Sequence, residues 1–419
     1  MDAGTLEEVA HLTLLLGRLL LGSGADTAHV QDAMVRFAAG FGCETHLLVN
    51  YEGVLLTLVS DERFLTKIGR RLPAMNVNMA AVAALSRVVD EVERHRLSLL
   101  ETRNELEEIE QRPPIYHRWI IVVALGLTAA SLARLFGADW PAFWITWLSG
   151  SLGTWLRQEC GRHGFNLFFI PFAAALGSGV VGGLAVLSGI SSTPSLCLVA
   201  PGMILMPGVP LVNGVHDIIR NHMSIGLDRL ALGIVVTLAI AFGLFVATAL
   251  TGSKIPVDAA FKVLSVPEDA LFSALAALGF LALFNVSPQM AWAGVACGVA
   301  SHTTRTLCSH LGIEIVSGTL IGALAANFLA KGFARHFRAP SVAFAFPGVV
   351  AMIPGAYAFR AYIGSLQVMQ GGASAPLPVV TETLALIATC LLMVTAIAIG
   401  IAAPLIPIER RATKAGVDQ

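Results

Sequence analysis

From residue 115 onward the chain is a succession of long apolar runs, and this constrains the fold more than any other feature. A helix needs about 20 apolar residues to cross a bilayer, and ten runs reach or approach that length. They lie near residues 117–136, 140–156, 165–188, 195–214, 227–250, 269–284, 288–304, 313–333, 342–364 and 379–406, with 140–156 and 288–304 the shortest. Only 13% of residues are charged and the mean hydropathy is +0.73. The sequence therefore predicts an α-helical polytopic membrane protein with about ten transmembrane helices.

The first 114 residues differ, because they carry a large share of the charge and contain no run of spanning length. Helical and strand patterns divide this region. The expected elements are two amphipathic helices in 5–41, a hairpin in 43–60 that turns at Tyr51-Glu52-Gly53, a strand near 64–72 and a long helix in 78–112. Asp26 or Ser23 is expected to cap the second helix, and Pro113 to end the last one. Residues 1–114 thus predict a small α+β domain whose last helix leads to the membrane.

Several classes of protein are disfavoured. The net charge is −1 and no glycine-rich phosphate loop is present, which argues against nucleic acid as a partner and against a nucleotide-driven pump. The six cysteines show no CxxC spacing, so neither a zinc site nor a disulfide framework is expected. In the first domain His11, His29, Asp26, Asp32 and His46 are too dispersed for a metal site. No GxSxG or HExxH motif occurs. We therefore expect no enzyme, no metal and no cofactor.

The basic residues predict an orientation. The N-terminus is acidic and lacks the basic start of a signal peptide, so the first domain is expected to stay in the cytosol. The inner side would then hold Arg157, Arg162, Arg220, Arg229, Lys331, Arg335, Arg338, Arg410, Arg411 and Lys414. The outer side would hold Arg134, Lys254, Lys262, Arg305 and Arg360. This ten-to-five bias predicts that both termini are cytosolic.

An internal repeat follows from the comparison of "WITWLSGSLGTWLRQECGRHG" with "WAGVACGVASHTTRTLCSHLG". At a constant offset of 148 residues, five positions are identical. The pairs are Trp144 and Trp292, Gly150 and Gly298, Arg157 and Arg305, Cys160 and Cys308, and Gly164 and Gly312. Downstream, "PGMILMPG" corresponds to "PGVVAMIPG". A duplication of five spans gives two copies, 115–260 and 261–419, and because five is odd they would cross the membrane in opposite directions. We therefore predict a 5+5 inverted repeat.

Each copy carries one apolar run interrupted by two Pro-Gly pairs. Proline removes a backbone donor, and a broken helix at membrane depth survives only where protein buries it or where it lines a cavity. The alternative is that each Pro-Gly segment is a structural kink with no role in binding. In inverted-repeat transporters such broken helices form the substrate site, and their half-helix N-termini favour an anionic group. The residues expected to bind substrate are Pro201, Gly202, Pro207, Gly208, Asn213, Pro347, Gly348, Pro354 and Gly355.

Ionisable residues near these runs are candidates for gating or proton coupling. They are Asp217, Arg220, Arg157, Arg305, Arg360, Glu314 and Glu382, together with His302. His216, like Asn213, is expected to hydrogen-bond a substrate hydroxyl or ammonium group. For Asp217 and Arg220 the alternative is a structural ion pair at the boundary, and for Arg157 and Arg305 a side chain that snorkels to the interface. For Glu314 and Glu382 it is an interfacial position. Asn166, Asn285 and Asn327 would line a cavity or make interhelical hydrogen bonds.

Three segments resemble one known family. "LLLGRLLLGSGADTAHVQDAMVRFAAGFG" is similar to the N-terminal region of the threonine/serine exporter family. "PGMILMPGVPLVNGVHDIIRNHMSIGLDRL" and "FAFPGVVAMIPGAYAFRAY" resemble its two membrane halves, here fused in one chain. Pro210 and Asn213 depart from the pattern and leave the substrate open. The resemblance implies a bacterial inner-membrane exporter of small amino acids, energised by the membrane potential or a proton gradient. Some two-component relatives are associated with succinate export.

The leading hypothesis is a proton-coupled antiporter that exports threonine or serine through the lipid bilayer by alternating access. The alternatives are a dicarboxylate exporter, a membrane-anchored sensor, and a channel. Asp217 at the site would favour an amino acid, whereas Arg157 or Arg305 there would favour a diacid. The first domain would gate the cytosolic vestibule, contact a second subunit or sense substrate, and a homo-oligomer is compatible with all of these.

Overall fold

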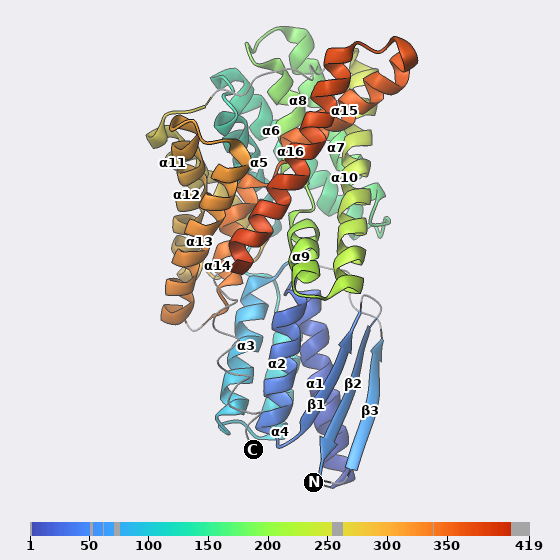
Figure 1. The fold of residues 1–419 in the computed structure, drawn as a ribbon, viewed down its shortest axis with the longest axis vertical. Helices are drawn as coiled ribbons and strands as arrows, with labels where there is room; N and C mark the ends of the chain where they lie inside the picture. Colours follow the sequence, from blue (N-terminus) through green and yellow to red (C-terminus); the bar gives the residue numbers. More distant parts are fainter. Residues whose placement is uncertain are drawn as a thin grey trace.

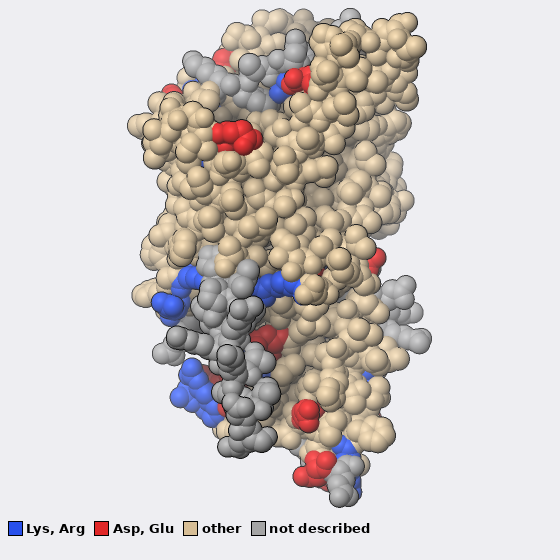
Figure 2. Space-filling model, viewed as in Figure 1, with Lys and Arg blue, Asp and Glu red and all other residues tan. Residues whose placement is uncertain are grey.

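The computed structural model describes residues 2–50, 53–61, 63–70, 76–253, 263–337 and 339–403. Figure 1 shows an elongated molecule in which a tall bundle of helices stands on a smaller part made of four helices and a three-stranded sheet. Figure 2 shows that the middle of the bundle carries almost no charged side chain on the face in view. Lysine and arginine gather in that view where the bundle meets the smaller part. An uncharged belt of this kind is what a lipid-facing surface requires.

The smaller part is formed by the N-terminal residues. Its elements are α1 (Ala3–Gly22), α2 (Thr27–Gly40), β1 (Glu44–Val49), β2 (Gly53–Ser60), β3 (Arg63–Arg70), α3 (Met79–Glu93) and α4 (Leu99–Gln111). The expected two helices, hairpin and third strand are confirmed, with β2 antiparallel to both neighbours. Asp26 caps α2, since its Oδ1 accepts a hydrogen bond from the His29 N–H at 3.0 Å. Tyr51 and Glu52 of the expected turn lie outside the described residues.

The single long helix expected over 78–112 is wrong, because α3 and α4 are separate helices that pack against each other. The chain leaves the helical conformation after α3, with a φ of 53° at His95. Ser98 then starts α4 through a capping box in which the Ser98 hydroxyl accepts from the Glu101 N–H and the Glu101 carboxylate accepts from the Ser98 N–H. Asp90 of α3 forms an ion pair with Arg36 of α2 at 2.6 Å.

The bundle follows the apolar runs of the sequence. Its first elements are α5 (Arg118–Leu135), α6 (Trp140–Arg162), α7 (Phe169–Ser188), α8 (Pro194–Met203), α9 (Gly208–Ile219) and α10 (Met223–Thr251). The rest are α11 (Val266–Leu283), α12 (Pro288–His310), α13 (Ile315–Phe337), α14 (Val342–Val349), η1 (Val350–Met352), α15 (Gly355–Gly371), η2 (Gly372–Ser374) and α16 (Leu377–Ala402). Within the described ranges, six helices are long and apolar enough to cross a membrane. The number is eight if α8 with α9, and α14 with α15, each form one bent span.

Helices α5 and α11 make a close contact within the bundle. The Thr128 hydroxyl donates to the backbone carbonyl of Ala276 at 3.2 Å, 148 residues further along the chain. Gly279 lies opposite, where a Cβ atom would overlap the Thr128 hydroxyl and lie 2.6 Å from the Ala124 carbonyl oxygen. Only a residue without a side chain allows the two backbones to approach this closely.

Replacing Gly279 with leucine is therefore expected to destabilise the bundle by about 1–3 kcal/mol or more, since overpacked sites that cannot relax carry costs of this order. Thermal unfolding of the purified protein in detergent would measure the loss. Gly332→Leu is the matched control, because a Cβ atom at Gly332 on α13 meets no atom within 4 Å. Equal melting temperatures for the two variants would contradict the close packing of α5 against α11.

The N-terminal part is bonded directly to the bundle. The Met79 N–H at the start of α3 donates to the Phe284 carbonyl at the end of α11, at 2.9 Å. Asn285 joins the same junction, because its Oδ1 accepts from the Ile115 N–H at 2.8 Å and its Nδ2 donates to Asn78 Oδ1 at 2.9 Å. These bonds fix the N-terminal part against one end of the bundle.

Candidate functional site

The two Pro-Gly segments form two broken helices, as predicted. The axis bends by 60° between α8 and α9, and by 43° between α14 with η1 and α15. Both breaks use the same turn. Pro207 has φ −78° and ψ 63°, and Pro354 has φ −77° and ψ 49°, which is the inverse γ-turn region. The N–H groups of Gly208 and Gly355 each donate at 2.8 Å to the carbonyl two residues earlier, on Met206 and Ile353.

The two breaks face each other inside the bundle. A Cβ atom at Gly208 would overlap the Ile353 side chain, and one at Gly355 would lie 3.2 Å from Met203 Cγ. Each α-helix that starts at a break therefore begins against the other broken span. The first N–H groups of such a helix have no acceptor within the helix and carry the positive end of its dipole. Pro210 removes one of these donors from the first turn of α9.

A cavity of about 390 Å³ lies where the N-terminal part meets the bundle. Its wall comes from the start of α2, from α9 and from α14 and α16. The polar lining residues are Asp26, His29, Asp32, Asn213, His216, Arg220 and Ser341. Groups of both charge signs thus face one space, whose volume is within the range of about 300–1,000 Å³ that small-molecule pockets occupy.

Asp26 provides a buried negative charge in this wall. Burial raises the pKa of its carboxyl, but the neighbouring His216, His29 and Arg220 and the hydrogen bond from the His29 N–H outweigh burial. The net result is a pKa below the ordinary value. Asp26 is therefore ionised at neutral pH and is able to accept hydrogen bonds from a cationic group in the cavity.

Asp217 does not line this cavity, although it lies on α9. It is fully buried and pairs with Arg229 of α10, with Nη1 2.7 Å from Oδ2. Its other oxygen accepts the Thr27 N–H at 3.1 Å, and Arg229 Nη2 donates to the Ala25 carbonyl at 3.0 Å. Asn213 adds a hydrogen bond from Nδ2 to the Gly24 carbonyl at 3.2 Å. The α1–α2 loop is thus held in the bundle by an ion pair that binds its backbone.

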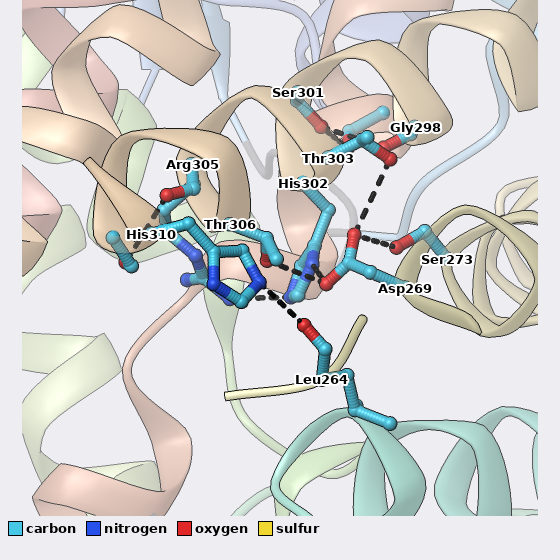
Figure 3. A network of polar contacts seen from close by, with 12 residues as sticks. Leu264, Asp269, Ser273, Gly298, Ser301, His302, Thr303, Arg305, Thr306 and His310 are labelled. Carbon is cyan, nitrogen blue, oxygen red and sulfur yellow. Dashed lines mark hydrogen bonds and ion pairs between the residues drawn. The ribbon is translucent and has the colours of Figure 1, made fainter. Parts of the chain in front are cut away.

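Arg305 belongs to a second buried cluster, near the start of α11, whose other end is bonded to the N-terminal part (Figure 3). Asp269 of α11 is its centre. Its Oδ2 lies 2.8 Å from His302 Nδ1 and accepts the Thr306 hydroxyl at 2.6 Å. Arg305 donates from Nη2 to His302 Nε2. Ser273 and Thr303 also donate to Asp269, each at 3.3 Å.

The remaining charged candidates lie elsewhere. Arg157, the counterpart of Arg305, is exposed on α6, and the described residues offer it no hydrogen bond or ion pair. Glu314 is exposed and accepts hydrogen bonds from Val316 and Ser317 at the start of α13. Glu382 is 42% exposed and lies 3.9 Å from the buried Arg360. The structure therefore brings together only part of the predicted set.

The three asparagines have separate roles. Asn327 is buried and donates from Nδ2 to the carbonyls of Gly400 and Ile401, at 3.2 and 2.6 Å, which is the interhelical bond expected as an alternative. Asn285 joins the N-terminal part to the bundle. Asn166 accepts the N–H groups at the start of α7 and is exposed. None of the three lines the cavity of about 390 Å³.

Sequence reasoning missed three residues that the structure places in these clusters. Arg229 was expected only as a loop cation on the inner side, whereas it is 1% exposed. Asp269 was not singled out at all, although a carboxylate at the start of an apolar run is a recognisable signal. Asp26 was expected only as a helix cap. The partners of Arg229 lie 12 and 204 residues away along the chain, and His302 lies 33 residues from Asp269, so spacing did not point to these pairs.

Comparisons with known proteins agree with the resemblance in the sequence. A family model described as "Putative threonine/serine exporter" matches residues 11–251, and one described as "Threonine/Serine exporter, ThrE" matches residues 269–406. Both membrane halves are therefore fused in one chain. No solved structure matches the chain.

Curated relatives cover most of the chain. It is 28% identical to the "Probable succinate transporter subunit YjjP" of Escherichia coli, over 59% of this chain and 96% of that protein. It is 25% identical to a "Probable threonine/serine exporter" of Mycobacterium tuberculosis, over 84% of this chain and 69% of that protein. It is 22% identical to a "Threonine/serine exporter" of Corynebacterium glutamicum, over 87% of this chain and 77% of that protein. Because the first family model alone spans more than half of the residues, the chain belongs to the threonine/serine exporter family.

Proposed function

We propose that this protein is a secondary active transporter that exports small amino acids, threonine and serine above all, across a bacterial inner membrane. Residues 1–114 form a cytosolic α+β domain, and residues 115–260 and 261–419 form two membrane halves of five spans each. The halves alternate access to a site between their broken helices, and export is coupled to protons. The observation that carries this proposal is the pair of breaks, built on the same turn, that face each other in the bundle.

Contacts that repeat at the offset of 148 residues support the inverted repeat. A Cβ atom at Gly150 would lie 2.7 Å from Ala129 Cβ, and one at Gly298 would lie 2.7 Å from Ala277 Cβ. Gly298 lies 148 residues after Gly150, and Ala277 lies 148 residues after Ala129, so the second contact repeats the first. Thr128 is bonded to Ala276, its own counterpart, as residues beside a twofold axis are. Inverted-repeat transporters place their substrate at such an interface.

The charges around the cavity favour an amino acid over a diacid. A zwitterion needs an acceptor for its ammonium group and donors for its carboxylate. Asp26 and Asp32 provide the first, and His216 and Arg220 provide the second. A dicarboxylate needs two sets of donors and would meet two carboxylates here. A succinate exporter is the second candidate, because the relative in Escherichia coli is named a probable succinate transporter subunit.

The N-terminal domain is proposed to gate the vestibule on its side. The α1–α2 loop supplies Asp26 to the cavity wall while Gly24, Ala25 and Thr27 are bound to α9 and α10. Movement of this loop would change the width of the cavity, because it forms one of its sides.

The test is counterflow in proteoliposomes loaded with threonine, serine or succinate, followed by uptake of the labelled compound. We expect exchange of threonine and serine, and its loss in Pro201→Ala/Gly202→Leu, since a Cβ atom at Gly202 would already lie 3.0 Å from the Phe359 ring. Exchange of succinate alone would favour the second candidate. No exchange of any of the three would contradict a transporter of small carboxylates and amino acids.

A further inference from the structure

The cluster around Asp269 is the most deeply buried group of ionisable side chains in the described part of the second membrane half. Asp269, His302 and Arg305 are 1%, 2% and 7% exposed, respectively. Three hydroxyl groups surround the Asp269 carboxylate, and Figure 3 shows His302 between the carboxylate and the guanidinium. Ionisable groups at such depth are costly and mark ion or substrate pathways. We therefore expect this cluster to contain a residue that binds a proton or an ion.

The hydrogen bonds define the protonation state of His302. A guanidinium has donors only, so the Arg305 Nη2 must donate and the His302 Nε2 must accept. The proton of the neutral imidazole is then on Nδ1, which donates to Asp269 Oδ2 at 2.8 Å. One anion, one neutral ring and one cation form the cluster, and its net charge is zero. The lone pair on His302 Nε2 accepts the N–H of Arg305, so this tautomer has no free acceptor in the ring plane.

We propose that His302 is the proton-binding residue of the exporter, with Arg305 as the group that its protonation displaces; this rests on the proposed transport function. A proton from water forms a bond to Nε2, using the electron pair that accepted the Arg305 N–H. The hydrogen bond to Arg305 breaks, since two donors then face each other. No other bond changes, and the cluster gains one positive charge. Release of the proton restores the hydrogen bond.

The displaced guanidinium lies beside the second break. Arg305 interacts electrostatically with Tyr357, in the first turn of α15. One turn earlier on α12, the Ser301 hydroxyl donates to the Gly348 carbonyl of α14 at 2.7 Å. The helix that carries His302 therefore contacts the first half of the broken span, and its Arg305 interacts with the start of the second half. Movement of Arg305 transmits the protonation of His302 to the start of α15, at one of the two breaks between which the substrate site is proposed to lie.

The surroundings of the ring contain few other charges. Asp269 faces it from α11 and Arg305 from its own helix, with Tyr357 of α15 beyond Arg305. Glu382 of α16 is paired with Arg360, on the far side of Tyr357. The neighbours on α13 and α14 at this level are glycines, Gly318 and Gly348. The charge on His302 is therefore set by its two direct partners.

The first membrane half has no equivalent site. The residues 148 positions before Asp269, His302 and Arg305 are Ile121, Thr154 and Arg157. Only the arginine is shared, and Arg157 is exposed. The asymmetry predicts one such proton site per chain and exchange of one proton for each amino acid.

The variant His302→Gln tests the proposal, because a glutamine amide can donate to Asp269 and accept from Arg305 but does not titrate. Two readouts are compared in proteoliposomes: threonine counterflow, which needs no net proton movement, and accumulation driven by a pH gradient. For 1:1 exchange, a gradient of about one pH unit supports about tenfold accumulation, since both correspond to the same free energy. We expect the variant to retain counterflow and to lose this accumulation.

His310→Gln is the matched control, because His310 lies on the same helix and its Nε2 is 2.8 Å from the Leu264 backbone carbonyl rather than from a charged group. It should behave as the wild type does in both readouts. Wild-type accumulation in His302→Gln would overturn the proposal, and so would loss of counterflow in a variant that still binds threonine. A wild type without counterflow would instead overturn the transport function on which the proposal rests.

A second measurement needs no transport. In weakly buffered detergent solution, threonine binding to the wild type should release about one proton per chain, detected with a pH indicator. The His302→Gln variant should bind threonine and release none. Equal proton release from the wild type and the variant would overturn the assignment to His302, even if the variant reconstitutes poorly.

Discussion

Replacing Arg229 with alanine is expected to reduce the free energy of unfolding by about 3–5 kcal/mol, the usual cost of removing one partner from a buried ion pair. Asp217 and Arg229 are 0% and 1% exposed at their side chains, and 2.7 Å separates Nη1 from Oδ2. The variant leaves the Asp217 carboxylate without its cation in a site that water does not reach. It also removes the hydrogen bond to the Ala25 carbonyl, which holds the α1–α2 loop.

Unfolding in mixed micelles measures this loss, with Arg112→Ala as the control. Arg112 forms a 2.7 Å pair with Glu108 in which both side chains are about half exposed or more, and such pairs contribute about 0–1 kcal/mol. The double variant Asp217→Asn/Arg229→Met should be more stable than Arg229→Ala, since no unpaired charge remains. Faster amide exchange at Thr27 is expected in Arg229→Ala. A loss as small as that of the control would contradict the role of this pair.

Replacing Gly208 with leucine is expected to abolish most transport while the protein still folds. A Cβ atom at this position would already overlap the Ile353 side chain of the facing break. Overpacking of this kind costs about 1–3 kcal/mol, and if it falls on one of two alternating states it shifts their ratio about 5- to 150-fold. We therefore expect threonine counterflow to fall by about tenfold or more.

Rescue by a second substitution distinguishes this effect from misfolding. Ile353→Ala removes the atoms that the leucine would meet, so Gly208→Leu/Ile353→Ala should recover part of the counterflow. Gly332→Leu serves again as the control for a helix glycine in open space. Full activity of Gly208→Leu would mean that the breaks do not approach each other in the transport cycle.

The helical architecture could be predicted because it depends on local pattern. Each of the ten apolar runs overlaps a helix or a bent pair, and both bent pairs lie where the Pro-Gly segments predicted them. The error at 78–112 was also local in origin. The sequence "SLLE" from Ser98 to Glu101 is a capping box, a recognisable helix start inside an apparently continuous pattern.

The contacts of the candidate site could not be predicted in the same way, because they join distant parts of the chain. Asp217 was singled out, but its bond to the Thr27 N–H spans 190 residues. The symmetry of Arg157 and Arg305 was visible, yet it did not show that only Arg305 is buried. That difference arises from Asp269 on the neighbouring helix α11. Its carboxylate offsets the cost of burying His302 and Arg305.

A reversible cross-link between the two breaks tests the central claim most directly. A Cβ atom at Gly355 would lie 3.4 Å from Met203 Cβ, close to the separation of about 3.5–4.5 Å that a disulfide requires. For Met203→Cys/Gly355→Cys, oxidation is predicted to stop threonine counterflow and reduction to restore it, while each single variant is unaffected by oxidation. Counterflow that continues at the wild-type rate in the fully cross-linked protein would contradict transport by movement of the two breaks.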